Sequence, residues 1–280
     1  MAGDALVSTE WLHARLDAPD LRAVDATWFL PTVERDARAE YEAAHLPGAV
    51  FVDIDAVADP DSALPHMLPD PVLMSARMRR LGLGDGNRIV VYDANDFIAS
   101  ARLWWQLRVF GHRDVAVLDG GLRKWQAEGR PVTDDPTVPR ERHFTARKNS
   151  LLVRELDQMR GMLAGRQAQI VDTRSPGRFA GAEPEPRAGL RRGHMPGALN
   201  VPYTRLIDPE SHALLPETGL RDVVGQAGIA LDRPIVASCG SGVSACVLAL
   251  ALDRLGLSDV AVYDGSWAEW GGRRDTPVAT

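Results

Sequence analysis

Short apolar runs alternate with longer amphipathic stretches along the whole chain. The runs cover residues 21–24, 50–52, 88–92 and 115–118 in the first half, and 169–171, 198–201, 234–237 and 260–262 in the second. Apolar runs of this length are typical of buried strands, and strands that alternate with helices favour a parallel sheet covered on both faces. The pattern predicts an α/β fold whose ligands bind at the carboxyl ends of the strands.

The pattern also repeats. Three motifs occur twice and in the same order: 23–27 returns as 170–174, 45–48 as 194–197, and 118–121 as 263–266. The stretch 136–150 has neither a helical nor a strand period and contains Pro136 and Pro139. We therefore predict two tandem copies of one domain, residues 1–135 and 151–280, joined by a linker at 136–150.

The clearest chemical signal follows the apolar run 234–237. Cys239 opens a loop that continues through Gly240, Ser241, Gly242, Val243 and Ser244, and a helical pattern begins near Ser244. Two glycines let the backbone curl around the sulfur, and peptide N–H groups with the positive end of a helix favour a thiolate. A buried, inert cysteine is the alternative. The first copy has Asp93 at the equivalent position, so it is predicted to be non-catalytic.

The loop around Cys239 contains no charged side chain. A cysteine phosphatase would need an arginine to hold the phosphate oxygens, and Ala245 occupies the position where it would fall. The loop therefore suits a sulfur nucleophile or a sulfur carrier.

Composition and charge limit the other classes. The 280 residues are 45% apolar and 25% charged with a net charge of −6, so two cores are expected and a nucleic-acid partner is not. No apolar run is long enough to span a membrane. Two cysteines are too few for a disulfide framework, which suits a cytoplasmic protein. No metal-ligand spacing or dinucleotide motif occurs, so no metal and no cofactor is expected.

The sequence CGSGVSA from Cys239 to Ala245 resembles the active-site loop of the 3-mercaptopyruvate branch of the rhodanese superfamily. Ser244 replaces the threonine that is usual there. Members that use thiosulfate typically carry basic residues directly after the cysteine, where this chain has Gly240 and Ser241. The resemblance implies tandem rhodanese-like domains, with Cys239 as the nucleophile and Gly240, Gly242, Val243 and Ser244 around the substrate.

The same resemblance extends to residues outside the loop. It implies that Arg178 and Arg187 bind the carboxylate and the ketone oxygen of the substrate, and that Asp55, His66 and Ser241 form a proton relay. Taken alone, each arginine is more typical of a solvated or salt-bridged surface position. The alternative for His66 is a histidine that is hydrogen bonded at a domain interface.

Three functions follow from these residues. The first is a sulfurtransferase that moves sulfur from 3-mercaptopyruvate, a 2-oxo thiol, through a Cys239 persulfide to a thiol such as thioredoxin or to cyanide. The second is a thiosulfate sulfurtransferase. The third is a sulfur-carrier or docking module without turnover of small molecules.

Overall fold

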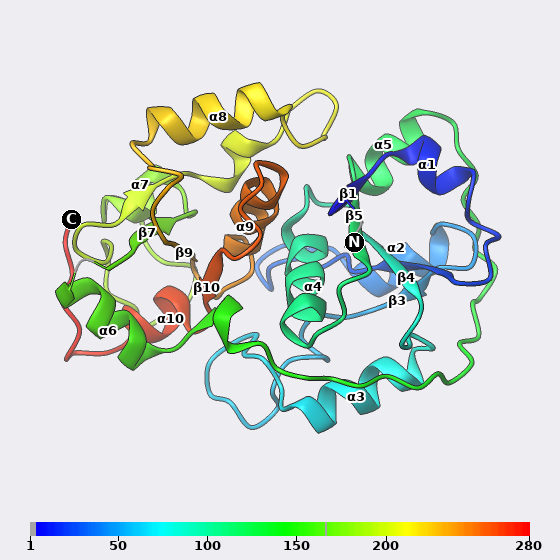
Figure 1. Cartoon of the computed structure of the whole chain (residues 1–280), viewed down its shortest axis with the longest axis horizontal. Coiled ribbons are helices and arrows are strands. Elements are labelled where there is room, and N and C mark those ends of the chain that lie inside the picture. The colour runs from blue at the N-terminus through cyan, green and yellow to red at the C-terminus, as the bar shows by residue number, and fades with distance from the viewer. Residues whose placement is uncertain (1–3, 166) are drawn as a thin grey trace. The chain divides into compact units, whose positions relative to one another are not determined.

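The structure is a computed structural model that describes residues 4–165 and 167–280, and it divides into two compact units. The first unit comprises residues 1–60, 69–149 and 208–214, and the second comprises 61–68, 150–207 and 215–280. Each unit contains a five-stranded parallel sheet (Figure 1). The α/β fold predicted from the sequence is confirmed.

The sheet of the first unit has the order β1-β5-β4-β2-β3. Its strands are β1 (Leu6–Val7), β2 (Leu21–Asp25), β3 (Val50–Phe51), β4 (Arg88–Tyr92) and β5 (Val115–Leu118). Its helices are α1 (Thr9–His13), α2 (Ala37–Ala43), α3 (Pro71–Arg80), α4 (Ile98–Val109) and α5 (Gly121–Ala127). The predicted strand 88–92 is found as predicted, whereas the two-residue edge strand β1 is too short to show a period.

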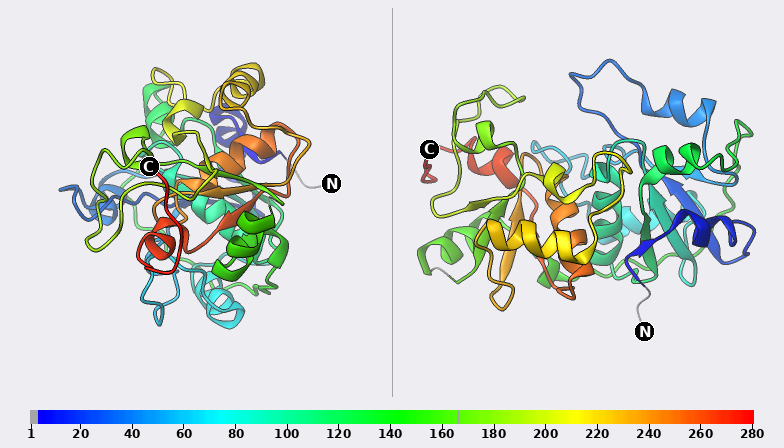
Figure 2. Two further views of the ribbon diagram at one scale, coloured as in Figure 1. Left: turned by 90° about the vertical axis from the view of Figure 1, so that its left-hand side faces the viewer. Right: turned by 90° about the horizontal axis from the view of Figure 1, so that it is seen from above.

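Local sequence explains where several of these helices begin. Asp70 accepts hydrogen bonds from the N–H groups of Val72 and Leu73, and Pro71 occupies the first turn of α3. The rings of His13 in α1 and Trp125 in α5 meet edge to face with centroids 5.7 Å apart, so these two helices pack against each other. Figure 2 shows the ribbon of the chain from two further sides.

The second unit repeats this plan with the order β6-β10-β9-β7-β8. Its strands are β6 (Val153–Arg154), β7 (Gln169–Asp172), β8 (Leu199–Asn200), β9 (Ile235–Ser238) and β10 (Ala261–Tyr263). Its α-helices are α6 (Leu156–Gly165), α7 (Pro176–Phe179), α8 (Glu217–Gln226), α9 (Ala245–Arg254) and α10 (Ser266–Trp270), and two 3-10 helices cover Ser150–Leu152 and Tyr203–Leu206.

Side chains from alternate positions of β9 and β10 form a core on one face of the second sheet. Val236 and Tyr263 pack with Met159 of α6 and with Trp267 and Trp270 of α10. Because successive side chains point to opposite faces, the intervening residues face the other side of the sheet, where the buried helix α9 lies (Figure 1). The predicted helix start near Ser244 agrees with α9, which begins at Ala245.

Each unit also takes up a short segment from the other half of the sequence. Residues 61–68 pack in the second unit, and residues 208–214 pack in the first. Residues 136–149, which were predicted to be part of a linker, fall within the first unit, where Phe144 is buried. The domain boundaries proposed from the sequence stay a prediction.

None of the helices in the described ranges has the length and apolar character needed to cross a bilayer.

Candidate active site

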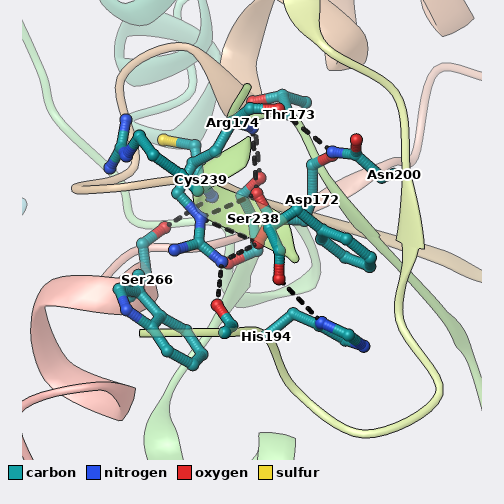
Figure 3. Close-up of polar contacts among 12 residues, drawn as sticks. Asp172, Thr173, Arg174, His194, Asn200, Ser238, Cys239 and Ser266 are labelled. Carbon is teal, nitrogen blue, oxygen red and sulfur yellow. Dashed lines mark hydrogen bonds and ion pairs between the residues drawn. The ribbon is translucent and has the colours of Figure 1, made fainter. Parts of the chain in front are cut away.

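Cys239 directly follows β9 and is 2% exposed. Its N–H donates to Oγ of Ser266 at 3.2 Å, and that hydroxyl donates to the carbonyl of Tyr263 at 2.8 Å (Figure 3). Its carbonyl accepts from the N–H of Trp267 at 3.0 Å, and the carbonyl of Gly240 accepts from Ala268 at 2.8 Å. The cysteine is therefore held between the end of β9 and the first turn of α10.

The loop then turns directly into α9. Gly242 has φ of 75°, a left-handed conformation that glycine adopts without strain. Oγ of Ser244 lies 3.1 Å from Oγ1 of Thr173, and Val243 is buried. α9 therefore begins immediately after the cysteine loop, as the sequence predicted.

The segment 61–68 brings His66 to this loop. Nδ1 of His66 lies 3.0 Å from Oγ of Ser241, and the imidazole is buried. The N–H of Leu68 donates to Oδ2 of Asp264 at 2.8 Å, which fixes the end of the segment. Asp55 belongs to the first unit, where its Oδ2 accepts a hydrogen bond of 2.7 Å from Nε1 of Trp28. Two members of the predicted relay, His66 and Ser241, are thus in direct contact.

Arg178 lies beside the cysteine loop. A Cβ atom built on Gly240 would be 2.9 Å from Nη2 of Arg178. The Nε and Nη2 atoms of Arg178 donate to Oε2 of Glu185 at 3.2 and 2.5 Å. Arg187 lies partly buried two residues beyond Glu185. The structure places Arg178 at the loop, and a role for Arg187 in binding the substrate stays a prediction.

Glu185 connects Arg178 to the sheet. Its Oε1 accepts from Nη1 of Arg174 at 2.6 Å, and Nη2 of Arg174 donates to Oδ2 of Asp172 at 2.6 Å (Figure 3). The side chains of Asp172, Arg174 and Glu185 are each 1% exposed. Burial alone would lower the pKa of Arg174, but the hydrogen bonds and charges of Asp172 and Glu185 outweigh it and raise the pKa above its ordinary value.

Sequence reasoning assigned no role to Arg174 or to Glu185. A signal for Arg174 is present, because the repeated motif has Thr27 in the first copy and Arg174 in the second. Glu185 lies two residues before Arg187, which the resemblance singled out, but nothing in the sequence shows which cation Glu185 binds. Asp264 belongs to the repeated motif 263–266, and its carboxylate accepts the N–H of Leu68.

Neither cysteine is in a disulfide. Both are buried, and Sγ of Cys246 donates to the carbonyl of Gly242 at 3.3 Å. Across residues 4–165 and 167–280, no cluster of three or more His, Cys, Asp or Glu side chains is arranged to hold a metal ion.

The first unit shows what occupies the equivalent site. Tyr92 pairs with Asp25 in the same register in which Ser238 pairs with Asp172, so Asp93 corresponds to Cys239. Oδ1 of Asp93 accepts from the N–H groups of Asn95 and Phe97 at 3.2 and 3.1 Å. Oδ2 accepts from Ala99 and Ser100 at 3.1 and 2.8 Å. The loop of the first unit therefore closes on a carboxylate of its own.

Comparisons with known proteins agree with this architecture. The model of the rhodanese-like domain matches residues 8–128 and 155–273. Human 3-mercaptopyruvate sulfurtransferase is 41% identical over 272 residues, which are 95% of this chain and 91% of the human protein. Rat thiosulfate sulfurtransferase is also 41% identical, over 95% of this chain and 91% of its own length.

Comparison with solved structures also indicates a two-domain rhodanese-like fold. The crystal structure of SseA from Escherichia coli, described as a 3-mercaptopyruvate sulfotransferase, superposes with a TM-score of 0.87 at 38% identity. The match covers 95% of this chain and 99% of SseA. The chain belongs to the rhodanese family, with two rhodanese-like domains, and it is an enzyme of the sulfurtransferase class. Its similarity extends to relatives named for 3-mercaptopyruvate, to a relative named for thiosulfate, and to relatives named for both donors.

Proposed function

We propose that this enzyme transfers sulfur from 3-mercaptopyruvate to a thiol acceptor through a persulfide on Cys239. The observation that carries the proposal is the composition of the loop. Gly240–Ala245 contains no charged side chain, and the cation beside it is Arg178, already paired with Glu185. This site suits a donor with one carboxylate better than a compact dianion.

In the first half-reaction the thiolate of Cys239 attacks the sulfur of 3-mercaptopyruvate. An S–S bond forms, the C–S bond breaks, and its electron pair goes to carbon C3, which takes up the proton lost by the donor thiol. The products are the Cys239 persulfide anion and pyruvate. Arg178 and Arg187 bind the carboxylate and the ketone oxygen, and Ser241 with His66 carries the proton. Asp55 is the third member of the relay that the family resemblance implies.

In the second half-reaction the acceptor attacks the outer sulfur. A new bond to that sulfur forms, the S–S bond to Cys239 breaks, and the cysteine leaves as a thiolate. Reduced thioredoxin and cyanide are suitable acceptors, and the kinetics are ping-pong because pyruvate leaves before the acceptor reacts. Peptide N–H groups of Gly240, Gly242, Val243 and Ser244 and the first turn of α9 stabilise the persulfide anion.

The surroundings of Asp93 in the first unit support this stabilisation of an anion by peptide N–H groups. There the loop and the first turn of α4 direct four N–H groups at a carboxylate. A loop of this kind after a parallel strand binds an anion, and in the second unit the anion is the sulfur of Cys239.

The test is steady-state sulfur transfer from 3-mercaptopyruvate and from thiosulfate, measured side by side with thioredoxin and with cyanide. We expect 3-mercaptopyruvate to be preferred by orders of magnitude in kcat/KM and Cys239→Ser to be inactive. Mass spectrometry after incubation with donor alone should show one added sulfur atom on Cys239.

Thiosulfate is the second candidate donor because the rat relative is named for it. A higher kcat/KM for thiosulfate would overturn the argument from the uncharged loop. If neither donor turns over while Cys239 still accepts a sulfur atom, the chain is a carrier or docking module. The expected cytoplasmic location stays a prediction from cysteine content and hydropathy.

A further inference from the structure

Four charged side chains form a continuous chain between the central sheet of the second unit and the cysteine loop. Asp172 at the end of β7 binds Arg174, Arg174 binds Glu185, and Glu185 binds Arg178. The three N···O distances are 2.6, 2.6 and 2.5 Å. Arg174 is also fixed by the carbonyl of Gly193 at 2.8 Å and by the ring of Trp267, which lies 4.4 Å from its Cζ.

The rhodanese-like fold does not require this chain of ion pairs. In the first unit, Oδ1 of Asp25 accepts the N–H of Thr27 at 2.8 Å, the same turn that Asp172 makes with Arg174 at 2.9 Å. The first unit has no arginine at this position, and burial raises the pKa of Asp25 to about 6. The arginine is thus present in the unit that carries the cysteine and is replaced by Thr27 in the unit that does not.

The chain of ion pairs ends beside the cysteine loop. Nη2 of Arg178 lies against Gly240, the residue after Cys239. Glu185 binds Nε and Nη2 of Arg178 on one edge of the guanidinium, so the opposite edge, formed by Nη1 and the second N–H of Nη2, is the one that can bind an incoming carboxylate. Because Asp172 offsets the charge of Arg174, the charge of Glu185 is the one that offsets Arg178.

We propose that Glu185 is a positioning residue that also determines donor specificity. It fixes the orientation of Arg178 from a buried support, and its charge reduces the positive potential at the sulfur. A donor with a single carboxylate is then held in one orientation, while a dianion finds too little positive charge. The inference rests on the proposed function, because it concerns the donor of that reaction.

The potential at Cys239 can be measured without any sulfur transfer. Iodoacetate is an anion and iodoacetamide is neutral, so the ratio of their alkylation rates at Cys239 reports the local potential. Glu185→Gln removes one negative charge at nearly constant shape, and we expect the ratio to rise about fivefold. The matched control is Glu183→Gln, because Glu183 is exposed in the same segment and its Oε2 accepts from Ser175 rather than from an arginine.

Donor specificity is measured on the same variants. The ratio of kcat/KM for 3-mercaptopyruvate to that for thiosulfate should fall at least tenfold in Glu185→Gln and should not change in Glu183→Gln. Glu185→Asp keeps the charge but shortens the reach to Arg178, so it should retain the alkylation ratio and lose part of the donor specificity. This variant also provides the test if Glu185→Gln does not fold.

The outcomes separate the two proposals. A wild-type enzyme without 3-mercaptopyruvate activity overturns the proposed function, and the alkylation ratio still tests the charge of Glu185. An active wild type whose alkylation ratio and donor ratio are the same in Glu185→Gln overturns the role of Glu185 alone. A loss of both donors by the same factor also overturns it, since that is the effect of a merely structural residue.

Discussion

At the scale of single residues, the two copies differ most where chemistry occurs. Asp93 and Cys239 take the same place after a central strand, but one brings its own anion and the other provides a sulfur. Thr27 and Arg174 also differ. Oγ1 of Thr27 accepts the N–H of Ala94 beside Asp93. Arg174 instead binds Glu185 and through it is connected to Arg178. The scaffold is shared, and the proposed function assigns the chemistry of the second copy to a few side chains that the first lacks.

Gly240→Ala tests the place of Arg178. The added methyl would lie 2.9 Å from Nη2, closer than real Cβ atoms come, and the flexible end of the arginine must move. We expect kcat/KM for 3-mercaptopyruvate to fall about tenfold because the carboxylate is no longer held in the reactive orientation. The melting temperature should change little. Gly161→Ala, in α6 with no atom within 4 Å of the new methyl, is the control and should leave activity intact.

Asp25→Asn tests the buried carboxyl that lacks a cation. Because its pKa is raised to about 6 in the folded chain, the folded state holds this proton at pH values where the unfolded state has lost it. Folding stability therefore decreases as the pH rises from about 4 to about 6, by roughly 2–3 kcal/mol for this one group.

The asparagine variant has no such proton to lose. The free energy of unfolding of Asp25→Asn, measured with urea at several pH values, should increase relative to that of the wild type between pH 4 and pH 6. Above pH 7 the difference between the two proteins should no longer change with pH. A difference between the two proteins that is constant over the whole range would show that Asp25 does not titrate in this window.

At the scale of elements, the equivalent segments 61–68 and 208–214 are each held by a hydrogen bond to an aspartate. The N–H of Leu68 donates to Asp264 in the second unit, and the N–H of Leu214 donates to Asp119 in the first. His66 and His212 precede these bonds, and both have positive φ. Nδ1 of His66 lies 3.0 Å from the hydroxyl of Ser241, whereas Nδ1 of His212 lies 3.0 Å from a carboxylate oxygen of Asp96. Each unit therefore fastens a histidine-bearing segment at its cysteine or aspartate loop.

The strands and the cysteine loop could be predicted from the sequence because both are local: an apolar run fixes a buried strand, and Gly242 permits the turn before α9. The packing of residues 61–68 and 208–214 could not be predicted, because the local pattern of apolar residues does not indicate which unit a loop will pack against. The partners of Glu185 and Asp264 were missed for the same reason. An ion pair depends on distances that only the folded chain sets.

Asp264→Ala and Asp119→Ala form a matched pair for this element. Each removes one carboxylate that accepts a backbone N–H, so both should lower stability by about 1–3 kcal/mol. Only Asp264→Ala loosens the segment that carries His66, and it should lower kcat for 3-mercaptopyruvate about tenfold, while KM changes less. Equal activity of the two variants would mean that the 61–68 segment does not need this bond to hold His66 in place.

At the scale of the whole molecule, the tandem copies separate stability from chemistry. The anion-binding loop of the first unit is saturated by Asp93, which is buried and whose pKa is raised mainly by that burial. A loop that is filled by its own carboxylate is not available to a sulfur anion. Under the proposed function, the first copy keeps the fold of the family and the reaction belongs to the second.

This division predicts opposite effects for two substitutions at equivalent positions. Asp93→Ala leaves four N–H groups without their carboxylate, and it should lower the free energy of unfolding by about 2–4 kcal/mol, because relief of the buried charge offsets only part of the loss. Below its melting temperature this variant should keep the kcat of the wild type. Cys239→Ser should do the reverse, with no sulfur transfer and an almost unchanged Tm, since the side chain keeps its size. Thermal unfolding and steady-state transfer on the same two preparations decide the matter: if Asp93→Ala loses activity in proportion to its stability even at low temperature, the first copy takes part in the reaction.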